Sequence, residues 1–225
     1  MDVEWPQPSI EIETAPRPDA SVIWLHGLGA DGNDLAAIVP ELSLSRSLAV
    51  RFVFPDAPYR PVTVNGGQVM RAWYDIEMTD TGFNQKLSHI RESEAFLRGL
   101  IDAEIARGVP VERVVLAGFS QGGAIALVTG LHFPKRLAGI MALSAPVPLA
   151  GSLMGQADPA NSQIPIFMAH GNFDGIIPFP TAQAARNLLA GGGAQIEWHE
   201  YPMEHTICAA EIKDMSSWLA ARFTI

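Results

Sequence analysis

Short apolar runs alternate along the chain with longer amphipathic segments, and this alternation limits the fold more than any other feature of the sequence. Runs rich in β-branched residues are predicted to be strands. They span residues 22–26, 51–55, 113–118, 138–144, 165–170 and 196–201. Most of them are apolar throughout, which is typical of strands covered on both faces of a parallel sheet.

Helices are predicted between these strands and after the last one. They cover residues 33–44, 86–107, 121–132, 181–190 and 207–223. In the helix 86–107, apolar residues such as Ile90, Leu97 and Ile101 recur at helical spacing, so one face should be buried. Strands that alternate with such helices indicate right-handed βαβ units. The sequence therefore predicts an α/β fold with a mostly parallel central sheet covered by helices on both faces.

The segment from Pro55 to Phe83 fits neither the strand period nor the helix period, and it contains several prolines and glycines. We expect it to be a long excursion over the sheet without regular structure, and loops of that length usually serve a function. The chain has no internal repeat and no linker-like tract. Residues 1–225 are therefore expected to form one domain.

Charge and hydropathy exclude several classes of protein. The formal net charge is −9, without any run of basic residues, so nucleic acid is not an expected partner. The first residues lack the basic start and apolar stretch of an export signal. No charge lies between Arg113 and Lys135 or between Arg136 and Asp158, and each window is long enough to span a bilayer. Glycine, serine and proline interrupt both windows, so we expect buried strands with turns and no transmembrane segment.

Cys208 is the single cysteine of the chain. One thiol cannot form an internal disulfide or a zinc site, which in a chain of this length favours a reducing compartment. We therefore expect a cytoplasmic location.

The sequence from Gly118 to Gly122 matches the pattern G-x-S-x-G, with Ser120 at its centre. A predicted strand precedes it and a predicted helix follows it, as in the strand–turn–helix that lifts a serine hydroxyl clear of a sheet. Both glycines are expected because a side chain there would collide with the neighbouring helix and strand. The alternative is that Ser120 merely caps the helix after a tight turn.

A serine hydroxyl needs a base within hydrogen-bond reach and a carboxylate behind that base. In hydrolases with this turn, the order along the chain is serine, acid and histidine. The acid is then Asp158 or Asp174, and we favour Asp174 because it directly follows a predicted strand. The base is His199 or His205, and we favour His205, which lies in a loop after a strand, whereas His199 lies within it.

Two other histidines, His26 and His170, each end a strand and are expected to organise loops. A glycine-rich segment follows His26, and such a loop can turn backbone N–H groups toward a ligand. We expect the N–H groups of Leu28 and Gln121 to bind an oxyanion there. A phosphate-binding loop is the rival interpretation, but neither G-x-G-x-x-G nor G-x-x-x-x-G-K is present. The chain also lacks clustered metal ligands such as H-E-x-x-H.

Five motifs in order resemble the carboxylesterase/acyl-protein thioesterase family of α/β hydrolases across nearly the whole chain. They are LHGLGADGND, PDAPYRPVTVNGG followed by RAWYD, AGFSQGGA, HGNFDGIIP and YPMEHT. The resemblance implies the α/β-hydrolase fold and a serine hydrolase with Ser120, Asp174 and His205 as its catalytic triad. It also implies that no cofactor is needed and that the protein is often a homodimer.

The resemblance further suggests that Arg71, Trp73 and Tyr74 help to form the rim of an acyl-binding site. The expected reaction is hydrolysis of small-molecule carboxylic esters, or of thioesters, through an acyl-enzyme. Bulky Trp73 and Tyr74 and the absence of room for a lid domain favour small to medium acyl chains. The alternative is an acyl-protein thioesterase or lysophospholipase that acts on longer chains and needs an exposed apolar groove.

Overall fold

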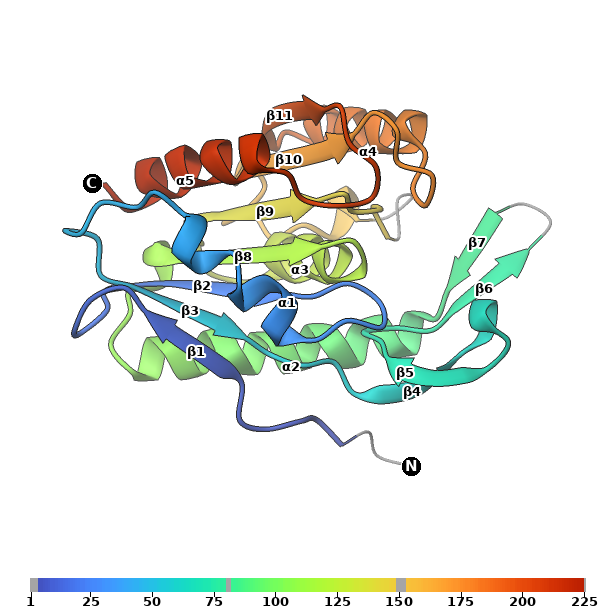
Figure 1. Ribbon diagram of the computed structural model, residues 1–225, viewed down its shortest axis with the longest axis horizontal. Helices are drawn as coiled ribbons and strands as arrows, with labels where there is room; N and C mark the ends of the chain where they lie inside the picture. Colours follow the sequence, from blue (N-terminus) through green and yellow to red (C-terminus); the bar gives the residue numbers. More distant parts are fainter. Residues whose placement is uncertain (1–3, 80–81, 149–152, 225) are drawn as a thin grey trace.

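A computed structural model describes residues 4–79, 82–148 and 153–224, and a seven-stranded sheet lies at its centre (Figure 1). Across the sheet the strands follow the order β1 (Ile10–Glu13), β3 (Val50–Phe54), β2 (Ala20–Leu25), β8 (Val114–Phe119), β9 (Gly139–Leu143), β10 (Pro165–Gly171) and β11 (Gln195–Tyr201). The edge strand β1 runs antiparallel to β3, whereas the other neighbouring strands pair in parallel. The carboxyl ends of the parallel strands therefore share one edge, where sites form in sheets of this kind.

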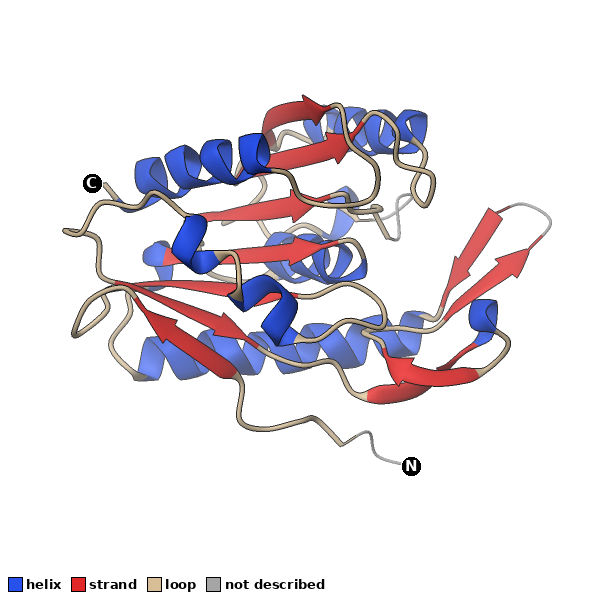
Figure 2. Cartoon of the chain, in the orientation of Figure 1, coloured by secondary structure: helices blue, strands red, loops and turns tan. Residues whose placement is uncertain are grey.

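Helices cover both faces of this sheet (Figure 2). One face packs against α2 (Leu87–Ala106), α3 (Gln121–His132) and α4 (Phe179–Gly191), and the other against α1 (Gly32–Ala36) and α5 (Ala209–Phe223). Side chains alternate between the two cores along each strand: in β2, Ile23 joins the first core and Trp24 the second. This alternation explains why the strands are apolar throughout.

The predicted parallel strands are confirmed to within about two residues at each end, but β1 was not predicted. Its sequence alternates isoleucine and glutamate over four residues, and only the isoleucines pack against a core. An edge strand of this length carries too short a pattern to stand out from a loop.

The prediction of one helix over residues 33–44 is wrong. The helix α1 ends at Ala36, and a separate 3₁₀ turn, η1 (Val39–Glu41), follows it. Pro40 lies within that turn and cannot donate the backbone hydrogen bond that a continuing α-helix would need. The apolar spacing continues past Ala36 because Leu35, Val39 and Leu42 still pack on the sheet.

The expectation that residues 55–83 lack regular structure is also wrong. Two antiparallel hairpins occupy most of this segment: β4 (Tyr59–Val62) with β5 (Gln68–Arg71), and β6 (Ile76–Thr79) with β7 (Gly82–Gln85). The first also contains the 3₁₀ turn η2 (Thr63–Asn65). Residues 80 and 81 lie outside the described part. Figure 1 shows both hairpins beyond the carboxyl ends of the parallel strands.

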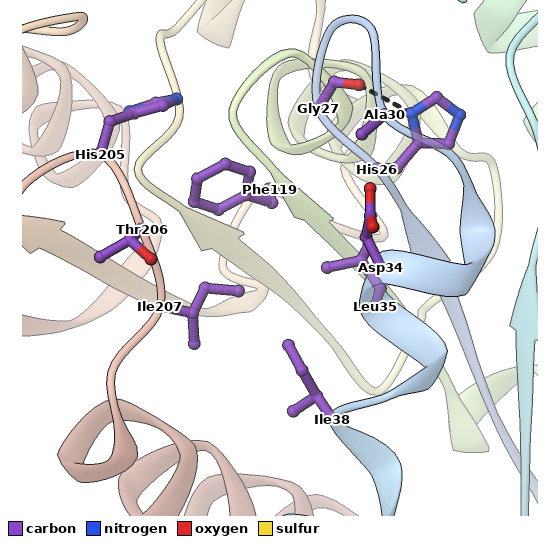
Figure 3. A pocket seen from close by; sticks show the side chains of 10 residues that line it. All are labelled: His26, Gly27, Ala30, Asp34, Leu35, Ile38, Phe119, His205, Thr206 and Ile207. Carbon is purple, nitrogen blue, oxygen red and sulfur yellow. Dashed lines mark hydrogen bonds between the residues drawn. The ribbon is translucent and has the colours of Figure 1, made fainter.

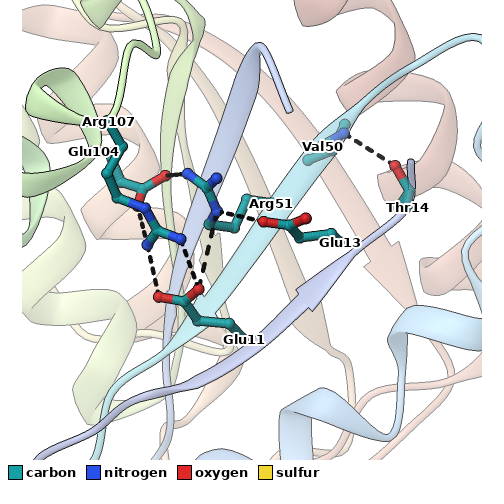
Figure 4. Close-up of polar contacts among 7 residues, drawn as sticks. All are labelled: Glu11, Glu13, Thr14, Val50, Arg51, Glu104 and Arg107. Carbon is teal, nitrogen blue, oxygen red and sulfur yellow. Dashed lines mark hydrogen bonds and ion pairs between the residues drawn. The ribbon is translucent and has the colours of Figure 1, made fainter. Parts of the chain in front are cut away.

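Buried charges join the edge strand β1 to the rest of the fold (Figure 4). The Arg51 guanidinium of β3 lies 2.9 Å from Glu104 of α2 and 3.0 Å from Glu13 of β1. Arg107, after α2, pairs with both Glu11 and Glu104 at 2.6 Å and 2.9 Å. Because Arg51 and Glu104 are almost fully buried, removing either one would leave the other buried with one opposite charge fewer.

In the part of the chain that the structure describes, no helix is long and apolar enough to cross a membrane. The two uncharged windows instead contain β8 with α3, and β9 with the loop after it. The remaining 3₁₀ turns are η3 (Val111–Arg113) and η4 (Met154–Gln156).

One buried carboxyl group makes stability sensitive to pH. Glu211, in the first turn of α5, is completely buried. Burial raises its pKa to about 8, and the nearby Asp214 carboxylate acts in the same direction, while the Cys208 backbone opposes both. Between the ordinary pKa of 4.5 and about 8, the folded chain therefore keeps a proton that the unfolded chain has released.

We expect Glu211 to contribute a fall in the free energy of unfolding as pH rises from about 4.5 to about 8, because the folded state then holds a proton that the unfolded state has released. Glu211→Gln should remove this fall and raise stability at pH 8.5 by a few kcal/mol, since one pKa unit corresponds to about 1.4 kcal/mol. Urea unfolding at pH 5 and pH 8.5 measures both effects. Glu41→Gln, at an exposed position, is the control and should leave the pH dependence unchanged. A Glu211→Gln variant less stable than wild type at pH 8.5 would contradict this account.

Candidate active site

The turn between β8 and α3 holds Ser120 in a strained backbone conformation, with φ 52° and ψ −120°. A β-carbon on Gly118 would overlap the backbone of Gly122, and one on Gly122 would overlap the Leu25 carbonyl of β2. Both glycines are therefore required by close approach, as expected. Ser120 occupies the N-cap position of α3, but its side chain makes no capping bond to the helix, so capping does not account for its hydroxyl.

Three side chains form a hydrogen-bonded chain at the carboxyl edge of the sheet. His205 Nε2 lies 2.9 Å from Ser120 Oγ, and His205 Nδ1 lies 2.7 Å from Asp174 Oδ2. The hydroxyl donates to Nε2 when Nδ1 carries the imidazole proton and donates it to the carboxylate. In this tautomer His205 can accept the serine proton.

Backbone contacts between two loops set the distance between Asp174 and His205. The Asn172 and Phe173 N–H groups donate to the carbonyls of Tyr201 and Met203 at 2.9 Å and 3.0 Å. A β-carbon on Gly171 would overlap the Met203 carbonyl, so the glycine at the end of β10 lets the second loop pack directly against it. These backbone contacts therefore hold the loop of Asp174 and the loop of His205 together.

Hydrogen bonds keep the Asp174 carboxylate ionised. Burial alone would raise its pKa, but the bond from His205 and the N–H groups of Ile177 and Ile176 outweigh burial, and the pKa lies below its ordinary value. His170 lies behind this loop, with Nε2 2.8 Å from the Ile177 carbonyl. It organises the loop, as expected.

The rejected alternatives lie elsewhere. The Asp158 carboxylate accepts from the Ala160 N–H at 2.9 Å within its own loop. The His199 imidazole contacts Glu197 at 2.9 Å and stacks between Phe167 and Tyr201. Neither residue lines the hollow that contains Ser120.

The two N–H groups expected to bind an oxyanion come from different elements: Leu28 lies in the loop after β2, and Gln121 begins α3. Leu28 and Gln121 both line the hollow beside Ser120, and within the described residues neither N–H donates to a backbone carbonyl. Gly29, with φ 78°, donates to the Arg71 carbonyl at 2.9 Å, which fixes this loop to the first hairpin. The N–H of Gln121 is free because α3 begins there.

The side chain of His26 holds the loop after β2 in place. Its buried imidazole accepts from the Ala57 N–H through Nε2 at 2.9 Å, so Nδ1 carries the proton and donates to the Gly27 carbonyl at 2.7 Å. Burial lowers the pKa of His26, in agreement with a neutral ring. His26 therefore organises the loop, as expected.

An apolar groove of about 690 Å³ opens beside Ser120. Its wall includes Val64 of η2, Ile76 and Phe83 of the second hairpin, and Ile176 after Asp174. Phe83 and Ile176 are more than half exposed, so the groove has an apolar rim open to solvent. Its volume is within the range of sites for small organic molecules.

The predicted rim residues need correction. Trp73 and Tyr74 are both completely buried. Tyr74 borders the groove, whereas Trp73 does not, and the Trp73 indole N–H donates to the His26 carbonyl at 2.8 Å. Arg71 does not line the groove either, because it pairs with Asp56 at 2.9 Å. In an irregular segment no sequence pattern tells which side chains border a groove and which pack in the core, which explains the error.

The side chain of Gln121 has a role that the sequence did not suggest. Its Oε1 accepts from the Trp73 N–H at 2.7 Å, and its Nε2 donates to the Tyr74 carbonyl at 2.8 Å. The residue therefore ties the groove wall to the turn at Ser120. Gln121 occupies a variable position of the G-x-S-x-G pattern, so the motif does not indicate a role for its side chain.

Among the described residues, no three histidine, cysteine or acidic side chains are placed to hold a metal ion.

A parallel sheet covered on both faces, with a serine on a strained strand-to-helix turn, defines an α/β hydrolase. The phospholipase/carboxylesterase family model matches residues 7–222, and the chain belongs to this family.

Named relatives agree with this family. Acyl-protein thioesterase 1 of Yarrowia lipolytica is 36% identical over 219 residues, which is 95% of this chain and 96% of that protein. Carboxylesterase SOBER1 of Arabidopsis thaliana is 35% identical over 204 residues, with 89% of this chain and 90% of that protein covered. The crystal structure of SOBER1 superposes with a TM-score of 0.84 at 34% identity, covering 90% of this chain and 98% of that one.

We expect Gln121→Leu to lower the free energy of unfolding by about 2 kcal/mol or more, because the Trp73 N–H and Tyr74 carbonyl would then be buried without partners. Gln68→Leu, at an exposed position of β5, makes the same chemical change and should shift stability by less than about 0.5 kcal/mol. Chemical denaturation of both variants measures the difference. Equal effects would show that the Gln121 contacts contribute nothing.

Proposed function

We propose that this protein is a serine hydrolase that cleaves carboxylic esters, and also thioesters, through an acyl-enzyme intermediate. The observation that carries the proposal is the continuous hydrogen-bonded chain from Ser120 through His205 to Asp174. The apolar groove beside Ser120 supports it, since an acyl chain needs such a surface.

In the first half-reaction, Ser120 Oγ attacks the carbonyl carbon while His205 Nε2 takes the hydroxyl proton. The carbonyl electron pair moves to the oxygen, and the N–H groups of Leu28 and Gln121 stabilise that negative charge. One such donor typically contributes about 3 kcal/mol to the transition state. The ionised Asp174 stabilises the imidazolium that forms.

Collapse of the tetrahedral intermediate breaks the bond to the leaving oxygen or sulfur, and His205 returns the proton to that atom. In the second half-reaction a water molecule attacks the acyl-enzyme, with His205 again as the base and then the acid. The carboxylic acid leaves, and Ser120 recovers its proton. Neither half-reaction calls for a cofactor.

The proposed substrates are small-molecule esters with small to medium acyl chains, which the groove of about 690 Å³ can enclose. The exposed rim at Phe83 and Ile176 favours a second candidate, an acyl-protein thioesterase or lysophospholipase whose longer chains extend over that rim. A cytoplasmic location and a homodimer stay predictions from the sequence.

We expect Ser120→Ala to reduce turnover of p-nitrophenyl butyrate by several orders of magnitude while the fold is retained, because only oxyanion binding and positioning remain. A fluorophosphonate should label wild-type Ser120 stoichiometrically, as peptide mass spectrometry can check. Circular dichroism controls for folding. Labelling at another residue, or more than a few per cent residual activity in Ser120→Ala, would refute the assignment.

Among p-nitrophenyl esters from two to sixteen carbons, we expect kcat/KM to be highest at four to eight carbons, measured below the critical micelle concentration. Tyr74→Ala should shift the optimum to longer chains, because it removes a ring from the groove wall. Tyr201→Ala is the matched control, since that ring is also buried, at 5% exposure, and does not line the groove. A wild-type maximum at sixteen carbons would support the second candidate instead.

A further inference from the structure

A second hollow, of about 300 Å³, also has His205 in its wall (Figure 3). We call it the trough. It lies between residues 34–38, which belong to α1 and the segment after it, and the segment from His205 to Ile207. Leu35, Ile38 and Ile207 give it apolar walls, Phe119 lies between the two segments, and Asp34 adds a carboxylate.

The trough is continuous with the acyl groove. Four residues line both hollows: Gly27, Ala30, Phe119 and His205. At Gly27 a β-carbon would lie 3.2 Å from Phe119 Cδ1 and 3.5 Å from Ser120 Cβ, so the missing side chain keeps the junction open. A single molecule can therefore extend from the groove past Ser120 and His205 into the trough.

We propose that the trough binds the leaving group of the substrate and that Asp34 makes it favour positively charged alcohols or thiols over negatively charged ones. This inference rests on the proposed function. A tetrahedral intermediate on Ser120 carries both the acyl chain and the leaving group, and His205 must return its proton to the leaving atom. The leaving group must therefore lie against His205. His205 lines both hollows, whereas Ser120 lines the acyl groove and not the trough, which leaves the trough for the leaving group.

The charge preference follows from the groups that face the trough. The Asp34 carboxylate is exposed, and its hydrogen bond from the Asp31 N–H is long, at 3.5 Å. Neither lysine nor arginine occurs among the described residues that line the trough. The nearby Arg71 is already paired with Asp56 at 2.9 Å. His26 is buried and neutral, so Asp34 contributes a negative charge that no lysine or arginine on the described trough wall neutralises.

The test compares butyrate esters of three alcohols of similar size: choline, which is cationic, 3,3-dimethylbutanol, which is neutral, and 3-hydroxypropanesulfonate, which is anionic. Wild-type kcat/KM should fall in that order. Asp34→Asn should lower the ratio of the cationic to the anionic ester at least about fivefold, because two charges 4 Å apart in water interact by an energy of that size. Asp34→Glu should keep the ratio, and added salt should shrink it.

Asp102→Asn is the matched control, since it removes one exposed carboxylate on α2 and should not change the ratio. If p-nitrophenyl butyrate is hydrolysed but Asp34→Asn keeps the wild-type ratio, the leaving-group assignment is wrong and the proposed function stands. If the wild-type protein hydrolyses none of the esters, the proposed function fails and the trough assignment fails with it.

Discussion

The approach of the N-terminus of α3 to the ends of β8 and β2 is the constraint on which the site depends. It leaves no room for β-carbons at Gly118 and Gly122, and it forces Ser120 into a positive φ. The same geometry frees the Gln121 N–H at the start of the helix and places the hydroxyl above the sheet. Backbone strain at one residue is stable here because the buried helix α3 and the sheet on both sides hold it in place.

The sequence predicts the parallel core and the position of the site because both depend on patterns that stay close together in the chain. The strand before Ser120, the loop after β10 and the loop after β11 each place one polar residue where a parallel strand ends. Since those ends share one edge, chain order alone brings Ser120, Asp174 and His205 near one another. Their assignment needs only the choice between two aspartates and two histidines.

The groove could not be predicted in the same way, because long-range contacts determine its walls. Trp73 and Tyr74 are neighbours between the two hairpins and both are completely buried, yet only Tyr74 borders the groove, while the Trp73 indole bonds to the loop after β2. Gln121 holds the backbone of both residues by hydrogen bonds to positions 48 and 47 residues away in the sequence. Among the described residues, each hairpin pairs its own two strands and not those of the main sheet, so no pattern shared with that sheet predicts the hairpins.

The acidic residues of β1 also affect how two chains can meet. An edge strand exposes unpaired backbone groups that can recruit a strand from another molecule. Two β1 strands side by side would bring Glu11 and Glu13 of one copy close to those of another, and their like charges would repel. Within one chain Arg51 and Arg107 pair with these carboxylates and also with Glu104, so three carboxylates share two guanidinium groups and a net negative charge stays at this edge. The arrangement therefore protects the open edge against sheet extension and aggregation.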